Sequence, residues 1–138
     1  MSVSAPASKP PQRVAISHLR DATFDAGLRS YAAYRDLGIA TATHGRAVAH
    51  VIRFKPPCTD EVRVWHTHAV DFQMIYVLEG WIETELEGDG VIRMDAGSSW
   101  LQPPNIRHRV VDYSDDCEVL EIVLPADFET VMDTAPLG

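Results

Sequence analysis

Short apolar segments, each ended by turn-forming residues, run through most of this chain and limit the folds that it can adopt. In Trp81–Leu86, apolar or uncharged side chains alternate with glutamates, which is typical of a strand with one buried face. One face of this segment carries Ile82, Thr84 and Leu86. Phe72–Leu78 precedes it, and Gly88-Asp89-Gly90 follows as a turn signal between antiparallel strands. The sequence therefore predicts a ladder of β-hairpins.

Other segments of the chain have the same character. We expect further strands at Val14–Leu19, Ala47–Phe54, Val62–His68, Val91–Met94, Ser98–Leu101, Ile106–Val111 and Cys117–Leu124. Their regular spacing is typical of a sandwich or barrel, so the predicted fold class is all-β. Helix signals are weak and confined to Leu28–Asp36 and to a short turn or helix at Pro125–Glu129.

Length and composition limit the organisation of the chain. Its 138 residues are enough for one domain with a real core. Residues 1–12 are small, polar and rich in proline, so we expect a flexible N-terminal arm followed by a single domain at 13–138.

Charge and apolar runs exclude several classes of partner. Twenty acidic residues against 12 basic ones give a net charge of −8, which opposes binding to nucleic acid. No apolar run is long enough to span a bilayer, and the first residues do not resemble a secretory signal. Cys58 and Cys117 form no Cys-x-x-Cys pair, so we expect ordinary thiols in a cytoplasmic protein without membrane contact.

Three histidines carry the strongest chemical signal. His66 and His68 are two residues apart in a predicted strand, so both side chains point to the same side. His108 follows in a later segment. Because imidazole binds several divalent transition metals, three of them from two segments are suited to hold one ion and leave positions open for substrate.

These histidines belong to two motifs that resemble the signatures of the cupin superfamily, in its small single-domain bacterial form. His66-Thr67-His68, Gln73 and Gly80 are similar to the first signature, and Gly97, Pro103 and His108 to the second. The resemblance covers about residues 47–125 and implies a double-stranded β-helix, a small jelly-roll barrel with ligands at its mouth. It also implies a homodimer, with strands around Val14–Leu19 or Ala47–Phe54 paired across subunits.

Gln73 departs from the family pattern, which has glutamate at this place. Three neutral imidazoles and an amide leave the full charge of the metal uncompensated, which favours an anionic chelating substrate. Gln73 can ligate the metal, hydrogen-bond a metal-bound water, or face the pocket without ligation. The ion is a divalent transition metal, with Fe, Mn, Ni, Zn and Cu all compatible with imidazole ligands. A polar barrel interior without metal is the alternative interpretation.

Three further residues are candidates for a small-molecule pocket. Trp100 and Gln102 share a strand face before Pro103, and Arg53 has the chemistry to clamp a substrate carboxylate. Each has a plainer alternative: Trp100 as a core residue and Arg53 as a solvent-facing one. Asn105 tolerates the left-handed backbone conformation that a turn at Pro103-Pro104-Asn105 would require. The other histidines, His18, His44 and His50, have no ligand spacing and are predicted to lie on the surface or pack.

Three functions are compatible with these features. The leading hypothesis is a metal-dependent oxidoreductase of the dioxygenase type, acting on a small anionic aromatic or dicarbonyl compound. A second is a non-catalytic module that binds a small ligand. A third is metal-assisted isomerase or lyase chemistry, which requires an inward carboxylate as general base, and Asp112 is the candidate that the sequence offers.

Overall fold

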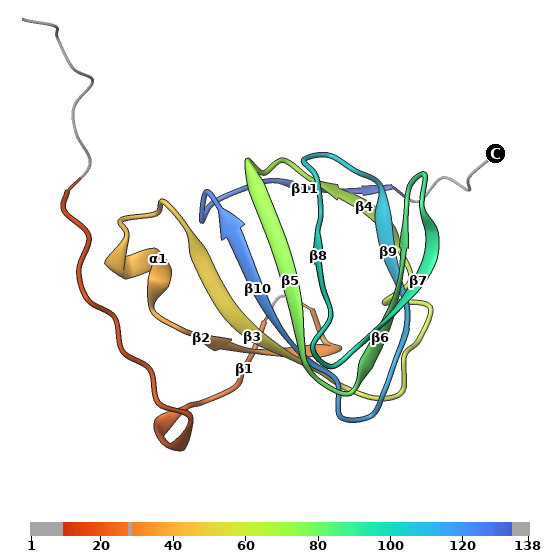
Figure 1. The fold of residues 1–138 in the computed structure, drawn as a ribbon, viewed down its shortest axis with the longest axis horizontal. Coiled ribbons are helices and arrows are strands. Elements are labelled where there is room, and N and C mark those ends of the chain that lie inside the picture. Colours follow the sequence, from red (N-terminus) through yellow and green to blue (C-terminus); the bar gives the residue numbers. More distant parts are fainter. Residues whose placement is uncertain (1–9, 28, 134–138) are drawn as a thin grey trace, which may run out of the picture.

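The computed structural model describes residues 10–27 and 29–133. Over these residues, two antiparallel sheets face each other and enclose a barrel-shaped interior (Figure 1). The six-stranded sheet has the order β1 (Asp25–Ala26), β2 (Ala32–Asp36), β3 (Val48–Phe54), β10 (Glu118–Leu124), β5 (Phe72–Glu79) and β8 (Ser99–Leu101). The five-stranded sheet has the order β11 (Thr130–Asp133), β4 (Trp65–His68), β9 (His108–Tyr113), β6 (Trp81–Leu86) and β7 (Gly90–Asp95).

Helical structure in the described ranges is limited to α1 (Ile39–Ala42) and the 3₁₀ turn η1 (Leu19–Asp21). No helix found there has the length and apolar character needed to cross a membrane. The predicted all-β jelly-roll fold is confirmed. Of the predicted N-terminal arm, only residues 10–12 are described, and the carbonyl oxygens of Pro10 and Pro11 lie 3.1 Å from Arg46 Nη1 and 3.0 Å from His44 Nε2.

The predicted hairpin ladder is confirmed at β6 and β7, whereas β5, the strand expected before them, lies in the other sheet and does not pair with β6. β6 has the predicted bounds, and Ile82, Thr84 and Leu86 are its buried side chains. It pairs with β7 across the turn at residues 87–89, and with β9 on its other side. The inward face of this hairpin therefore lines the barrel, while its glutamates remain outside.

Several expected elements are wrong. Val14–Leu19 contains no strand, and its last residue begins η1. The helix expected at Leu28–Asp36 is replaced by β2, because pairing with β3 outweighs a weak local helix preference. Val62–His68 becomes a strand only from Trp65, and Pro125–Glu129 is not helical. β11 was not expected, and it pairs with β4.

The expected pairing of Ala47–Phe54 across subunits is also wrong as stated. Within the chain, β3 is hydrogen-bonded to β2 on one side and to β10 on the other, so it presents no free edge. Val14–Leu19 pairs with no strand of its own chain, and its pairing across subunits stays a prediction.

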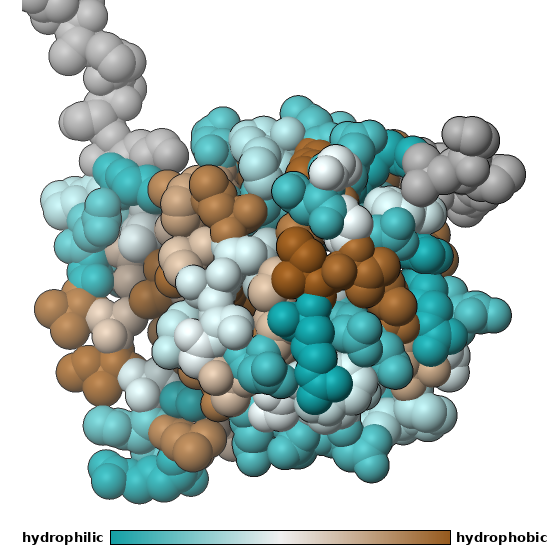
Figure 2. Space-filling model, turned by 45° about the vertical axis from the view of Figure 1, so that its right-hand side comes forward, coloured by the Kyte–Doolittle hydropathy of each residue, from teal (hydrophilic) through white to brown (hydrophobic). Residues whose placement is uncertain are grey.

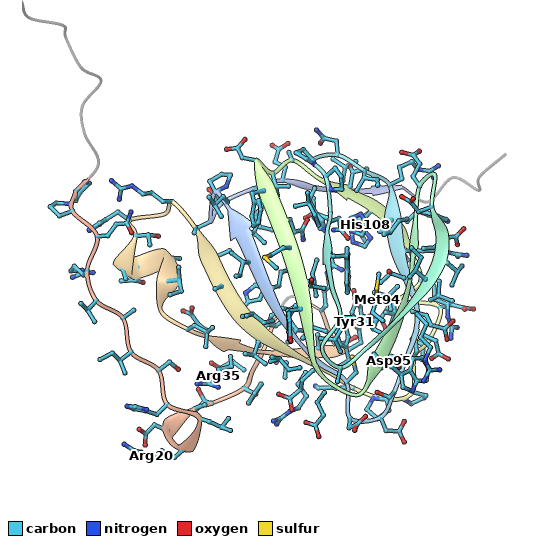
Figure 3. The ribbon with its side chains drawn as sticks, viewed as in Figure 1. Arg20, Tyr31, Arg35, Met94, Asp95 and His108 are labelled. Carbon is cyan, nitrogen blue, oxygen red and sulfur yellow. The ribbon has the colours of Figure 1, made fainter. Side chains whose placement is uncertain are left out.

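Apolar side chains of both sheets fill the interior. Val77, Cys117 and Val123 are fully buried, and Phe54 stacks at a tilt on Tyr113 with ring centroids 4.9 Å apart. Figure 3 shows Met94, Tyr31 and His108 between the two sheets. One region of the interior therefore holds packed core, and another holds polar side chains.

The outer face of the six-stranded sheet is also partly apolar. On β5 and β8, Phe72, Tyr76, Leu78 and Leu101 are exposed. Exposed apolar side chains interrupt the hydrophilic surface in the view of Figure 2. Strands of this sheet thus carry apolar residues on both faces.

Candidate metal centre

Neighbouring strands of one sheet bring the three histidines together. The side chains of His66 and His68 both point inward from β4, and His66 is directly opposite His108 on β9. The ring centroids of His66 and His108 are 4.1 Å apart, and those of His68 and His108 are 4.9 Å apart. One ligand atom from each imidazole lies within 4.8 Å of the others, and all three residues are buried.

The turn before β9 has the predicted form and is tied to β4. Asn105 adopts φ 62°, in the left-handed region that asparagine tolerates. Its backbone N–H donates to the carbonyl of His68 over 3.0 Å. The proline-containing turn is therefore hydrogen-bonded to the strand that carries the other two histidines. This bond fixes the position of His108, the first residue of β9.

Hydrogen bonds orient the imidazole rings. His66 Nδ1 lies 2.8 Å from the Val64 carbonyl oxygen, and His108 Nδ1 lies 2.9 Å from that of Ile106. A carbonyl oxygen only accepts, so each Nδ1 carries the proton and each Nε2 keeps its lone pair. His68 Nδ1 is held 2.8 Å from Thr130 Oγ1 on β11. This is the arrangement in which histidines bind metals.

The three histidines are neutral near pH 7. Burial, followed by the neighbouring His108, lowers the pKa of His66 to about 3 and that of His68 to about 4. Burial also lowers the pKa of His108. A metal ion therefore does not compete with protons for these nitrogens at neutral pH.

Two glutamine side chains continue the polar region. Gln73, on β5, is 2% exposed, and its Oε1 accepts a hydrogen bond of 3.0 Å from Gln102 Nε2. Gln102 Nε2 is also 3.0 Å from His108 Nε2. The indole N–H of Trp100 donates to Gln102 Oε1 over 3.3 Å. Gln73, Gln102 and Trp100 thus meet beside the histidines.

An inward carboxylate is present, but it is Glu121 on β10. Glu121 Oε2 accepts a hydrogen bond of 2.9 Å from Gln73 Nε2, and Oε1 lies 2.7 Å from His50 Nε2. Burial raises the pKa of Glu121, but the hydrogen bonds from His50 and Gln73 outweigh this and leave it below its ordinary value. Glu121 is therefore ionised at neutral pH.

Asp112 is not the inward carboxylate that the sequence suggested. Its side chain accepts a hydrogen bond of 2.9 Å from the backbone N–H of Tyr113, and it does not line the interior cavity. The sequence contained a signal for Glu121, a charged residue in the middle of the apolar run Cys117–Leu124. His50 lies opposite it in the β10–β3 register, so it is a site residue as well.

A cavity of about 410 Å³ opens beside these residues. Its walls are largely apolar, with Ile52, Ile75, Ile82 and Val119 among the lining residues. Trp100 and Gln102 line it together with the three histidines and Gln73, and their contact with a substrate stays a prediction. The cavity therefore combines a polar group of nitrogen and oxygen donors with apolar walls.

Arg53 is not a residue of this cavity. It is exposed on the other face of β3, where Arg53 Nη2 lies 3.3 Å from Glu118 Oε2 and its guanidinium stacks 3.8 Å from the ring centroid of Phe24. Arg29 lines the cavity instead, and its Nη1 donates to the Tyr31 hydroxyl over 2.7 Å. No motif marked Arg29, because it lies in the turn region before β2, where a helix was expected.

The donor set fits a divalent transition metal. Three neutral imidazole nitrogens converge, their other nitrogens are held by hydrogen bonds, and a cavity leaves room for further ligands. Such a site is of the open kind that metalloenzymes use, in contrast to a closed structural site.

Comparisons with known proteins agree on the fold. KdgF from Halomonas sp. matches with a TM-score of 0.64 and 21% identity, over 78% of this chain and 92% of that one. The polyketide cyclase RemF from Streptomyces resistomycificus matches with a TM-score of 0.62 and 18% identity, over 92% of this chain and 87% of that one. A salicylate 1,2-dioxygenase from Pseudaminobacter salicylatoxidans has a TM-score of 0.62 at 10% identity, over 78% of this chain.

This chain spans only 32% of the dioxygenase but nearly all of the first two proteins. At these identities the likeness shows the fold alone. None of the curated proteins compared matches the chain. The Cupin domain model matches residues 51–123, more than half of the sequence, and this segment contains the three histidines, both glutamines and Glu121. The chain belongs to the cupin domain family.

Proposed function

We propose that this protein is a metal-dependent enzyme, a dioxygenase-type oxidoreductase that acts on a small aromatic or dicarbonyl compound. The observation that carries this proposal is the arrangement of His66, His68 and His108, buried at one cavity with their Nδ1 atoms held by hydrogen bonds. A redox-active divalent metal such as iron supplies, when bound, the Lewis acidity and electron transfer that dioxygen chemistry requires.

The protein side chains have separate tasks in this proposal. The three histidines hold the ion, and Gln73 and Gln102 present amide groups beside it. The apolar walls exclude bulk water, and the Trp100 indole offers a flat surface to a ring. In a dioxygenase reaction both atoms of O₂ enter the product, so no external reductant is needed.

Charges along the cavity favour a substrate with one anionic group. Glu121 offsets part of the charge of a divalent ion, because it lies one hydrogen bond beyond Gln73. Of the two arginines that line the cavity, Arg109 pairs with Glu85 at 2.9 Å, whereas no described carboxylate pairs with Arg29. Arg29 therefore takes the role of anion clamp that Arg53 cannot fill.

Metal analysis and oxygen uptake test this function. We expect the purified protein to contain about one transition-metal ion per chain, and His108→Ala to lose it, whereas His18→Ala, which changes an exposed histidine, retains it. The iron-loaded protein should consume oxygen with at least one of a panel of catechols, salicylates and diketones. No oxygen uptake with any of them would contradict a dioxygenase and favour a non-catalytic binding module.

A second candidate is metal-assisted proton transfer without dioxygen, as in isomerases and lyases. Glu121 favours it, because this carboxylate lines the cavity, whereas Asp112, the base suggested by the sequence, does not. In this reaction Glu121 takes a proton from a carbon next to a carbonyl and returns it to another atom of the substrate. Anaerobic exchange of that proton for deuterium, lost in Glu121→Gln, would support it over the dioxygenase.

The assembly and location of the protein belong to the same proposal. We expect a homodimer, and the exposed apolar side chains of β5 and β8 favour a contact between copies there instead of the pairing of Ala47–Phe54 across subunits. Light scattering should then give a mass near twice 15.3 kDa. The free thiols of Cys58 and Cys117 accord with a cytoplasmic location.

A further inference from the structure

Hydrogen bonds around Gln73 form a chain with a single direction. The Trp100 indole donates to Gln102 Oε1, Gln102 Nε2 donates to Gln73 Oε1, and Gln73 Nε2 donates to Glu121 Oε2. The distances are 3.3, 3.0 and 2.9 Å. The chain starts at a group that can only donate and ends at one that, when ionised, can only accept.

These two ends determine which way both amides point. If Gln73 were turned over, its Oε1 would face the Glu121 carboxylate and its Nε2 would face Gln102 Nε2. Two acceptors and two donors would then meet without hydrogen bonds among buried groups, which is strongly unfavourable. The carbonyl oxygen of Gln73 is therefore held on the side of Gln102 and His108.

Glu121 is itself fixed in place. Its second oxygen lies 2.7 Å from His50 Nε2, and the two residues are direct partners in the β10–β3 register. The His50 ring packs at its edge against Tyr34, with centroids 5.2 Å apart. Since both carboxylate oxygens have partners from different strands, Glu121 is a rigid acceptor for Gln73.

We propose that Glu121 is a positioning residue that fixes the Gln73 amide with its carbonyl oxygen toward the three histidines. The site thereby receives a neutral oxygen donor beside the metal, while the negative charge stays one hydrogen bond away. This role rests on the proposed metal-dependent function for its effect on the ion, but the orientation itself is a property of the metal-free protein.

The experiment compares four proteins: the natural sequence, Gln73→Glu, Glu121→Gln and the double variant. In urea unfolding of the metal-free proteins, Gln73→Glu should lower stability markedly, because it places two carboxylates in contact. In the Glu121→Gln background the same substitution should be much less harmful, because the amide now at position 121 donates to the carboxylate at 73. Equal effects of Gln73→Glu in both backgrounds would overturn the proposal.

The affinity for Zn²⁺ tests whether Glu121 holds the Gln73 amide in position at the metal site. Glu121→Gln should weaken the affinity for Zn²⁺ by about tenfold or more, because an amide at this position can donate as well as accept and no longer fixes which way the Gln73 amide points. Glu118→Gln is the matched control, since it removes a carboxylate from the same strand outside the cavity, and its affinity should be unchanged. Unchanged affinity in Glu121→Gln would overturn the proposed role. If the natural protein binds no metal, the proposed function fails, and the unfolding comparison alone decides the orientation.

Discussion

Each imidazole of the candidate centre depends on a second residue that fixes its ring. For His66 and His108 this residue is a backbone carbonyl, which substitution cannot remove. For His68 it is the Thr130 hydroxyl, contributed by β11, a strand that the sequence pattern did not predict. Substitution of Thr130 can therefore test whether the orientation of the His68 ring matters for metal binding.

We expect Thr130→Val to weaken Zn²⁺ affinity by about tenfold, because the valine keeps the shape of threonine but leaves His68 Nδ1 without its partner. Isothermal titration calorimetry measures this change. Thr130→Ser, which keeps the hydroxyl, serves as the control and should bind nearly as the natural protein does. Equal affinities in the valine and serine variants would show that the hydroxyl does not orient the ring.

Residue identity predicted part of this site. His66, His68 and His108 were recognisable because their spacing has a meaning that does not depend on the rest of the fold. Glu121 was not, although it stands out as a charge in an apolar strand. The alternate residues Val119 and Val123 are buried, and Leu120, Ile122 and Leu124 on the other face are apolar too. Alternation therefore left the inward face of β10 undecided.

At the scale of elements, the corner at which the chain passes from β5 in one sheet to β6 in the other requires glycine. Gly80 has φ +71°, and a Cβ at this position would lie 2.1 Å from Ser114 Oγ. Ser114 cannot easily move away, because its hydroxyl accepts a hydrogen bond of 2.8 Å from the backbone N–H of Trp81. The corner is thus constrained by both conformation and space.

Gly80→Ala should destabilise the protein by clearly more than Gly90→Ala. Gly90 has a similar φ of +76° but open space around it, so its substitution measures the conformational term alone, about 1–2 kcal/mol. Gly80→Ala adds the clash with Ser114. Urea unfolding of both variants gives the comparison, and equal losses of stability would show that the corner relaxes without strain.

For the whole molecule, two buried acidic groups predict instability at alkaline pH. Burial raises the pKa of Cys117 from 9.0 to about 12 and that of Tyr113 from 10.0 to about 12. Above pH 9 the unfolded chain releases protons that the folded chain retains, so unfolding is favoured as pH rises. Stability from these groups is complete below pH 9 and is lost progressively toward pH 12.

By pH 11 the loss from Cys117 should be on the order of 3 kcal/mol, measured as the free energy of unfolding in urea across pH 8–11. Cys117→Ala should be less stable at pH 8, because it leaves space in the core, but its stability should fall less steeply above pH 9. An equally steep decline in both proteins would assign the alkaline loss to other groups.

The sequence alone determined the all-β class, the hairpin at β6 and β7, and the three histidines, because strand alternation, turn residues and ligand spacing are local properties. The tertiary structure decided the rest. β2 and β11 exist because neighbouring strands pair with them, not because of their own pattern. Which face of β3 and β10 points inward was decided by sheet packing, and this placed His50 and Glu121 at the cavity and Arg53 outside it. When both faces of a strand carry apolar residues, its own sequence does not indicate which face points inward. Only pairing with the neighbouring strands decides this.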